Sequence, residues 1–354
     1  MIKNKYALIK NSSPSVLFKV QGGNDFGTGH VMRSLELANE FSPSRVTFFC
    51  NDNENIVPQI KNRGYSYVMS PMDEDTEFAL LSRVIKDKKI DIIIIDQPTP
   101  YGALCRRLRN VFGDLFIVGL DCFENESSFD LIINLWERNN ISIVLKKPQY
   151  FEGLKYSIIR DSYQQYAAIT KKIRDQPENI VLTFGGVDPN LNTGKVLKLL
   201  NKITDKRLKI QVVLGFAFKD EKTVIAECND SNHICTLMKK APNFEELVFK
   251  ADLGFTGAGT TMMEFCAVGT PLIVCPQNGQ ERLFAKIFEK SGAVQLLDTN
   301  NEEAALKIIR ETISDLRFRK AMSKKQKQLI DIKGKERIRH LILKTFRLSK
   351  EPTK

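Results

Sequence analysis

The residues best suited to chemistry lie in the stretch GGNDFGTGH, residues 22–30, where a glycine-rich turn precedes an expected helix. Glycine permits positive φ angles and a close backbone approach, and a helix N-terminus offers free N–H groups with partial positive charge. We therefore expect Gly27 and Gly29 to make room for an anion or a sugar oxygen. The helix dipole favours a neutral His30, which can accept a proton as a general base. The alternative is that His30 only caps or packs the turn.

A second glycine-rich joint, TFGGVDPNLNTG, again follows an expected strand and precedes a long helix. Gly185 and Gly186 could approach a ligand, since ligands of open α/β sheets bind where strands end and helices begin. The other interpretation is an ordinary turn between a strand and a helix, with Asp188 and Asn190 fixing its shape.

A third joint, ADLGFTGAGTTMMEF, ends in a helix that begins at two threonines. Hydroxyls and backbone amides at a helix start suit a diphosphate, so we expect Gly259, Thr260 and Thr261 to bind one. Glu264 follows about one helical turn later, where its carboxylate could hold a ribose diol. The segment PQNGQ (276–280) follows the next strand and could reach the same crevice.

Several other kinds of site are disfavoured. The lysine of a P-loop is absent, and Arg33 and Ser34 stand where a dinucleotide-binding motif would need its third glycine. There is no GxSxG nucleophile motif, and His233 and His340 lack carboxylate or cysteine partners at metal-binding spacing. We expect no metal and no cofactor, and structural roles for these two histidines.

These joints require alternating strands and helices. Apolar runs separated by helical patterns indicate parallel sheets covered on both faces, so the fold class is α/β. The pattern pauses in a polar helical segment and then restarts, which predicts two domains and a linker. The expected ranges are 1–160 for the N-terminal domain, 161–178 for the linker, 179–325 for the C-terminal domain and 326–354 for a basic C-terminal helix. The expected strands are 15–20, 45–50, 65–69, 90–96, 115–121, 131–135, 179–186, 208–215, 233–238, 251–257, 270–276 and 293–297.

The net charge of +11 belongs to one segment. Residues 317–354 carry 14 basic and 3 acidic side chains, and the remaining 316 residues carry 39 of each. An amphipathic helix pair with a solvated basic face explains this, and weak contact with an anionic membrane surface is an alternative. We expect no nucleic-acid partner.

The start of the chain has no secretory signal, and no apolar run is long enough to span a membrane. The seven cysteines include no CxxC pair, which argues against a disulfide framework. We expect a cytoplasmic protein with reduced cysteines.

Four segments taken in order, GTGHVMRSLELA, LTFGGVDPNLNTGKVL, NFEELVFKADLGFTGAGTTMMEFCAVGTPLIV and DIKGKERI, resemble the UDP-sugar hydrolases of pseudaminic acid biosynthesis. The spore-coat polysaccharide proteins, and more remotely the peptidoglycan UDP-GlcNAc transferase, share this pattern. The resemblance covers roughly residues 15–340. It implies the GT-B fold, in which two Rossmann-like domains with parallel sheets face each other across a cleft and the last helix crosses back to the first domain.

The resemblance also implies roles for individual residues. UDP would bind the C-terminal domain, with the main chain near Phe244 against the uracil, the threonine joint against the diphosphate, Glu264 against the ribose and Gln280 against the sugar. His30 would activate water for inverting, metal-independent attack at the anomeric carbon. The full set of expected ligand-binding residues is Gly27, Gly29, Gly185, Gly186, Phe244, Gly259, Thr260, Thr261, Glu264, Asn278 and Gln280.

The chain departs from the hydrolase pattern on the sugar side. Asp96-Gln97-Pro98 replaces a DHY motif, leaving Tyr101 as the nearest tyrosine, and Asn278 stands one place early relative to an NQ pair. Asp121-Cys122 replaces an aspartate pair, and Gln21 replaces an acidic residue.

Three hypotheses follow. The first is hydrolysis of a UDP-linked amino-deoxy sugar, such as UDP-2,4-diacetamido-2,4,6-trideoxy-β-L-altropyranose, to UDP and free sugar for nonulosonic acid or surface glycan synthesis. The second is an inverting GT-B glycosyltransferase with a UDP-sugar donor, and the third is a non-catalytic nucleotide-sugar binding protein. The sequence indicates neither the sugar nor the oligomeric state.

Overall fold

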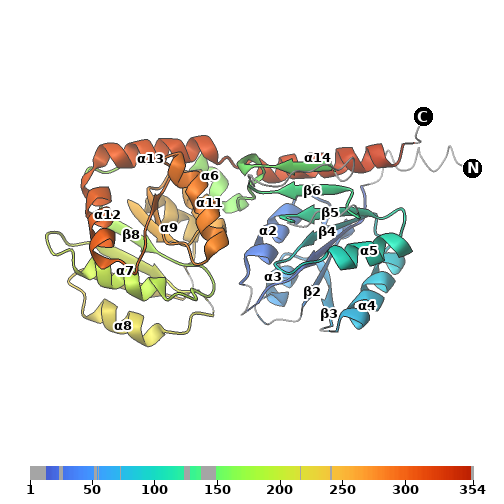
Figure 1. Ribbon diagram of the computed structural model, residues 1–354, viewed down its shortest axis with the longest axis horizontal. Coiled ribbons are helices and arrows are strands. Elements are labelled where there is room, and N and C mark those ends of the chain that lie inside the picture. The colour runs from blue at the N-terminus through green and yellow to red at the C-terminus, as the bar shows by residue number, and fades with distance from the viewer. Residues whose placement is uncertain are drawn as a thin grey trace, which may run out of the picture. The chain divides into compact units, whose positions relative to one another are not determined.

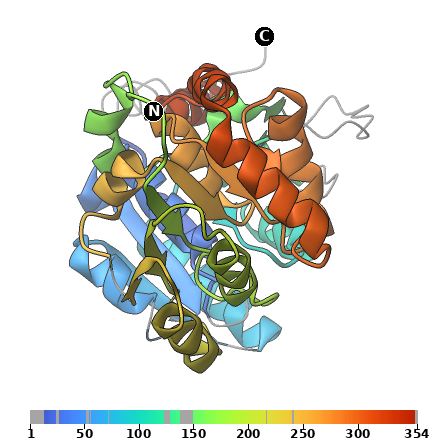
Figure 2. The same ribbon diagram turned by 90° about the vertical axis from the view of Figure 1, so that its left-hand side faces the viewer.

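The computed structural model describes residues 13–351 except 24–26, 52, 53, 55, 72, 123–127, 137–148, 216 and 240. Two compact units divide the chain. Unit 1 comprises residues 1–158 and 333–354, and unit 2 comprises residues 159–332. Each unit is built around one parallel sheet with helices on both faces (Figures 1 and 2). The expected α/β class with two Rossmann-like domains is confirmed.

Unit 1 contains a seven-stranded sheet in the order β3-β2-β1-β4-β5-β6-β7, in which neighbouring strands run parallel. Its strands are β1 (Val16–Val20), β2 (Val46–Asn51), β3 (Ser66–Ser70), β4 (Ile92–Asp96), β5 (Phe116–Leu120), β6 (Leu131–Asn134) and β7 (Gln149–Glu152). Its helices are α2 (Gly29–Ala38), α3 (Val57–Asn62), α4 (Glu74–Asp87), α5 (Gly102–Val111) and α14 (Gly334–Ser349), with short 3-10 turns at Pro43–Arg45 and Leu154–Tyr156.

The two faces of this sheet bury different side chains, because successive residues of a strand point to opposite sides. Phe18 of β1 packs with α2, α3 and α14, whereas Leu17 packs with α4 and α5. Figure 1 shows α2 and α3 on one side of the sheet and α4 and α5 on the other. Strand β7, a half-exposed edge strand, is absent from the sequence prediction because QYFE has no apolar run.

Helix α14 belongs to unit 1 although it ends the described chain. Ile338, Ile342 and Phe346 recur at a spacing of four residues, so they lie on one helix face and enter the core beside β6. Gly334 starts this helix against Ser157, where a Cβ atom would lie 1.9 Å from a carbonyl oxygen. Only glycine therefore fits where the helix begins.

Unit 2 contains a six-stranded parallel sheet in the order β10-β9-β8-β11-β12-β13. Its strands are β8 (Asn179–Leu182), β9 (Lys209–Val213), β10 (Ile234–Met238), β11 (Leu253–Thr256), β12 (Leu272–Val274) and β13 (Gln295–Leu296). Its helices are α6 (Gln164–Ala167), α7 (Asn192–Asn201), α8 (Glu221–Asn229), α9 (Phe244–Lys250), α10 (Thr260–Val268), α11 (Gly279–Lys290), α12 (Glu302–Ser314) and α13 (Leu316–Leu329), with a 3-10 turn at Asp161–Tyr163.

Part of the basic C-terminal segment is structural. Arg319 on α13 has no exposed surface and donates hydrogen bonds to four main-chain oxygens, those of Thr312, Ile313, Arg174 and Asp175. Lys335 on α14 is 5% exposed and lies near Glu36 of α2 and near Glu40, which follows the end of α2. Because both side chains are buried and have partners inside the protein, they are not available to a surface partner.

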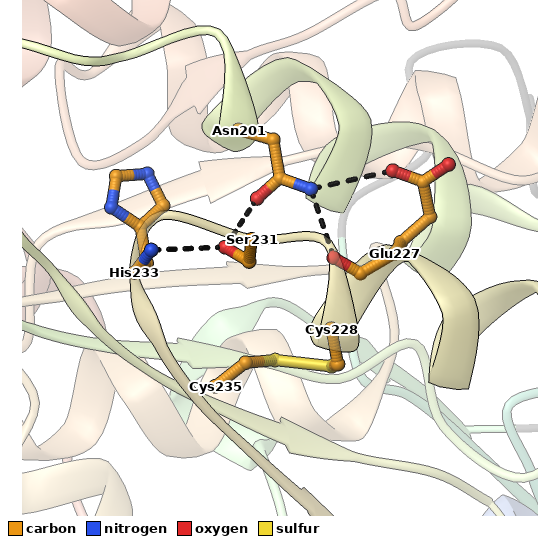
Figure 3. The surroundings of a disulfide bond; sticks show 6 residues. All are labelled: Asn201, Glu227, Cys228, Ser231, His233 and Cys235. Atoms are coloured by element: carbon orange, nitrogen blue, oxygen red, sulfur yellow. Dashed lines mark hydrogen bonds between the residues drawn. A yellow bond between two sulfur atoms is a disulfide. The ribbon is translucent and has the colours of Figure 1, made fainter.

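One disulfide contradicts the expectation of reduced cysteines. Cys228 at the end of α8 and Cys235 on β10 are bonded, with their Cα atoms 5.3 Å apart (Figure 3). Because α8 runs back to β10 through a short turn, residues seven positions apart come within bonding distance. Nearby His233 donates from Nε2 to the Leu200 oxygen and accepts at Nδ1 from the Leu208 N–H, which confirms its structural role.

Candidate functional site

His30 is held by a buried carboxylate at the end of a neighbouring strand. It is the second residue of α2, and its Nδ1 lies 2.7 Å from Oδ1 of Asp96, the last residue of β4. The His30 side chain is 24% exposed and that of Asp96 is fully buried. Strands β1 and β4 are adjacent, so the helix after β1 begins beside the carboxyl end of β4. The histidine therefore has one ring edge fixed inside the protein.

Asp96 is in turn held by α2. Arg33 donates from Nε to Oδ2 at 2.8 Å and from Nη2 to Oδ1 at 2.6 Å, and the Ser34 hydroxyl donates to Oδ2 at 2.8 Å. These residues follow His30 by three and four positions, so all three share one helix face. Arg33 also donates to Asp121 at 3.1 Å. Burial would raise the pKa of Asp96, but the charge of Arg33 and the hydrogen bonds from Arg33 and His30 hold it well below its usual range.

This ionised carboxylate decides which ring nitrogen of His30 carries the proton. Nδ1 also lies 2.9 Å from Nη2 of Arg33. A carboxylate only accepts and a guanidinium only donates, so Nδ1 can form a hydrogen bond with just one of them. The Asp96 contact is shorter, and we assign the Nδ1 proton to it. Nε2 then carries the lone pair that a general base needs.

The glycine-rich turn before α2 is anchored on the next strand. Asn51, at the end of β2, donates to the Gly22 oxygen at 2.7 Å and accepts from the Gly22 N–H at 3.1 Å. Gly23 and Gly27 pair at the base of the loop, and Gly27 has a φ of +68° that disfavours other residues. Gly29 is the first residue of α2.

In unit 2, the structure brings the second joint, the third joint and the PQNGQ segment together. The Gln277 side chain donates to the Phe184 oxygen at 3.1 Å, and Asn190 donates to the Gln277 oxygen at 2.7 Å. Strands β8, β11 and β12 are consecutive in the sheet, so their carboxyl ends form one edge. The chain reverses direction of winding between β8 and β11, which is where open α/β sheets bind ligands.

In the second joint, an aspartate accepts hydrogen bonds from the start of the following helix. Asp188, with a φ of +47°, accepts hydrogen bonds from the Asn192 N–H at 2.9 Å and the Thr193 N–H at 2.8 Å. This carboxylate therefore accepts from the first two N–H groups of α7. Gly185 has a φ of +77°, and with Gly186 it forms the loop in front of α7. The structure thus gives this joint the shape of a fixed turn.

The third joint leaves a helix start open. Gly259 precedes α10, no side chain caps this helix, and Thr260 and Thr261 form its first turn. A carboxylate oxygen of Glu281 accepts from the N–H groups of Ala258 at 3.0 Å and Gln277 at 2.9 Å. Burial raises the pKa of Glu281, while these hydrogen bonds lower it. Glu281 thus fixes the loop, and no side chain caps the amides at the start of α10.

Glu264 forms an ion pair that the sequence did not reveal. It is 3% exposed on α10, and Arg160 donates to both of its oxygens, from Nε at 2.5 Å and from Nη2 at 2.9 Å. The Tyr163 hydroxyl donates to Oε2 at 3.3 Å. The Arg160 guanidinium also lies over the Phe244 ring, 5.6 Å from its centroid. The residues expected at the ribose and the uracil are therefore joined by one arginine.

The remaining expected residues have simpler surroundings. Asn278 caps α11 by accepting from the Glu281 N–H at 2.9 Å, and Gln280 is exposed on the first turn of α11. Tyr101 is 4% exposed, and its hydroxyl lies 3.4 Å from the Ile95 oxygen and 3.5 Å from the Leu120 oxygen. This hydroxyl is thus directed at main-chain oxygens at the strand ends.

The sequence analysis assigned no functional role to four residues that the structure places at the candidate sites: Asp96, Arg33, Arg160 and Glu281. Asp96 ends the apolar run IDIIIID, and an acidic residue at the carboxyl end of a buried strand is a usable signal. No such signal marks Arg33, Arg160 or Glu281. Arg33 and Arg160 have partners far away in the sequence, and Glu281 accepts from main-chain N–H groups of loops.

Comparisons with known proteins bear on the fold and on the C-terminal half of the chain. Residues 180–340 match the model of the glycosyltransferase family 28 C-terminal domain. An uncharacterized protein of Methanocaldococcus jannaschii is 28% identical over 274 residues, covering 74% of this chain and 55% of that protein. The UDP-2,4-diacetamido-2,4,6-trideoxy-beta-L-altropyranose hydrolase of Campylobacter jejuni is 23% identical over 261 residues, covering 67% of this chain and 89% of the hydrolase. The chain thus spans about half the length of the archaeal relative.

Solved structures show the same fold. Acinetobacter baumannii MurG matches with a TM-score of 0.66 and 13% identity, covering 94% of this chain and all of that one. Anabaena HepE in complex with UDP-glucose matches with a TM-score of 0.62 and 12% identity, covering 95% of this chain and all of that one. The chain has the GT-B fold, and its C-terminal half is similar to a glycosyltransferase family. Among the described helices, none is long and apolar enough to cross a membrane.

Proposed function

We propose that this protein hydrolyses a UDP-linked amino-deoxy sugar to UDP and the free sugar. The observation that carries the proposal is the contact between Nδ1 of His30 and the buried carboxylate of Asp96 at 2.7 Å. It leaves Nε2 as a positioned base on a partly exposed imidazole. The Campylobacter relative bears the name of such a hydrolase, and HepE was solved with UDP-glucose, which supports a nucleotide-sugar substrate.

In the proposed reaction, His30 takes one proton from water at Nε2. The water oxygen attacks the anomeric carbon, the bond from that carbon to the diphosphate oxygen breaks, and the bonding electrons leave with UDP. Attack from the face opposite the leaving group inverts the anomeric carbon. Asp96 keeps the imidazole oriented and stabilises its charge once the proton has moved.

Unit 2 would bind the nucleotide. Amides at the start of α10 suit the diphosphate, and their partial positive charge would offset the charge that develops on the leaving group. Glu264 is already oriented by Arg160, and a carboxylate has room for further hydrogen bonds from the ribose hydroxyls. In this proposal Phe244 lies near the uracil, and Gly259, Thr260 and Thr261 contact the phosphates.

The test is UDP release from a panel of UDP-amino sugars, including the diacetamido-trideoxy-altrose derivative, in EDTA and without any acceptor. We expect release with the intact protein and none with His30→Ala, while UDP binding stays intact. His340→Ala is the matched control, because this exposed histidine lies on α14. If His30→Ala releases UDP as fast as the parent, His30 is not the base.

A second candidate function is transfer of the sugar to an acceptor other than water, and the glycosyltransferase family match of residues 180–340 favours it. It predicts that UDP release begins only when an acceptor is added. Saturable binding of UDP-sugars without turnover, with or without acceptors, would instead indicate a non-catalytic nucleotide-sugar binding protein.

A further inference from the structure

The outer face of α14 carries positive charge that has no partner within unit 1. Residues 337–350 contain five arginines and lysines and no aspartate or glutamate. Arg339, Lys344 and Arg347 are exposed, and among the described residues no carboxylate lies within ion-pair distance of them. Whereas Arg319 and Lys335 are buried structural charges, these three cations are available to an anionic partner.

The cations lie on the side of α14 that faces away from the core. His340, Lys344 and Leu348 recur every four positions, and Arg339 and Arg347 lie beside them, so all five share the exposed side of the helix. From residue 339 to residue 348 this side is about 14 Å long, at 1.5 Å per residue. It is therefore a continuous basic surface rather than a single charge.

The end of α14 meets the ends of two other helices. Nζ of Lys350 donates to the main-chain oxygen of Asp114, two residues before β5, at 2.7 Å. Nζ of Lys86, near the end of α4, lies 5.8 Å from the ring centroid of Phe112, which follows α5. The ends of α4, α5 and α14 thus form one surface of unit 1, near the amino end of β5.

This surface also exposes large aliphatic side chains. Val111, the last residue of α5, and Leu348 are each 50% exposed, and both lie within three positions of the contact between Lys350 and Asp114. A membrane interface offers anionic headgroups and an apolar boundary together. The backbone of a nucleic acid would attract the cations but would leave the two aliphatic side chains without an apolar partner. The combination therefore favours a lipid surface.

The docking surface consists of Val111, Arg339, Lys344, Arg347 and Leu348. We propose that it binds the surface of an anionic lipid bilayer. The three cations approach the headgroup phosphates, and the two aliphatic side chains enter the boundary between headgroups and acyl chains. The contact is peripheral, and it does not rest on nucleotide-sugar hydrolysis.

The test is co-sedimentation of the full chain, without nucleotide, with lipid vesicles. One set is pure phosphatidylcholine and the other contains about 30% phosphatidylglycerol, which supplies the negative surface potential. We expect saturable binding to the anionic vesicles in about 0.05 M NaCl and at least tenfold weaker binding in about 0.5 M NaCl, because the screening length falls from ~14 Å to ~4 Å. No binding to anionic vesicles at low salt, or equal binding to phosphatidylcholine, would overturn the proposal.

Two variants locate the surface. A cation near an anionic bilayer raises the affinity roughly fivefold, so Lys344→Gln/Arg347→Gln should weaken vesicle binding at least tenfold. Leu348→Ser should weaken it about threefold, because it removes apolar surface from the boundary region. The matched control is Lys320→Gln/Lys324→Gln, which removes two exposed lysines of α13 in unit 2. Equal losses in this control and in the α14 variant, or unchanged binding by Leu348→Ser, contradict the assigned surface.

A nucleic-acid partner is the competing outcome, and a single-stranded oligonucleotide tests it by fluorescence anisotropy. We expect no saturable binding in about 0.15 M NaCl. Oligonucleotide binding that Lys344→Gln/Arg347→Gln abolishes and Leu348→Ser leaves unchanged would assign the surface to nucleic acid and overturn the proposal. Urea unfolding of each variant shows that it folds like the parent. UDP binding should stay unchanged throughout, since the nucleotide is assigned to unit 2.

Discussion

Replacing Asp96 with asparagine tests the central feature of the candidate site. The substitution keeps the side-chain shape and removes the charge on which His30 and Arg33 converge. An asparagine side chain can also present its NH2 group to Nδ1, which would favour the other tautomer of His30 and place the proton on Nε2. The base would then be lost although His30 itself remains.

The expected effects on activity and stability follow from burial. Loss of the orienting carboxylate of a catalytic histidine lowers kcat by roughly 10²–10⁴-fold. Removing one member of a buried ion pair costs about 3–5 kcal/mol, and because Arg33 keeps its contact with Asp121 we expect about 2–4 kcal/mol here. UDP affinity should not change, because Asp96 belongs to unit 1 and the nucleotide is assigned to unit 2.

The pH dependence has a definite sign. The folded-state pKa of Asp96 lies below its unfolded value, so its charge stabilises the fold above the unfolded pKa, and this contribution fades as the pH falls below about 5. The stability difference between the parent protein and Asp96→Asn should therefore be full at pH 7 and shrink toward pH 3. Trp136 is the single tryptophan and packs against the unit 1 core, so its fluorescence during urea unfolding reports on this unit.

The control is Glu36→Gln. Glu36 is a 4% exposed carboxylate of the same helix, but it pairs with Arg63 at 2.7 Å instead of His30. It should lower stability without lowering kcat. If Asp96→Asn retains kcat within about threefold of the parent, or if Glu36→Gln reduces kcat to the same extent, the assigned role of Asp96 is wrong.

Three further predictions concern unit 2. Glu264→Gln should weaken UDP binding about tenfold in calorimetry, because the variant loses the contact with the ribose hydroxyls. It should leave the binding of 2′,3′-dideoxy-UDP unchanged. Equal losses of affinity for both ligands would argue against a ribose contact. Burial lowers the pKa of Lys171 to about 8, so its charge destabilises the fold below that pH and the penalty is relieved between pH 8 and 10.5. Lys171→Met should therefore raise the free energy of unfolding by about 2 kcal/mol at pH 7 and by less at pH 10, and a constant gain would contradict this cause. Asp188→Ala should cost about 1–2 kcal/mol by uncapping α7, whereas Asp188→Asn should restore part of it in thermal unfolding.

The sequence predicts the elements well because they depend on local patterns. The runs IDIIIID and NIVLTFGG place two central strands within a few residues of their observed bounds. The glycine joints follow from backbone requirements that are equally local. The edge strand β7 and the Cys228–Cys235 disulfide were missed, since neither has a pattern that distinguishes it from a loop or from buried thiols.

The side-chain contacts of the site could not be predicted in the same way. Arg33 meets Asp96 across 63 residues of sequence, and Arg160 meets Glu264 across 104. Such pairs depend on which strands become neighbours and on how each helix is rotated about its axis. Neither property can be read from a single sequence. The strand order does explain them afterwards, because β1 beside β4 brings the start of α2 to the end of IDIIIID.

The same neighbourhood accounts for two adjacent residues with different partners. Asp96 contacts α2, where it holds His30 and Arg33, whereas Gln97 contacts Lys19 of β1. Because side chains alternate between the faces of a sheet, one strand end can serve a site on each side. Asp96→Asn and Gln97→Leu should therefore have separable effects on turnover, because only the first removes the contact of His30. Equal losses of turnover in both variants would mean that the end of β4 acts as one site.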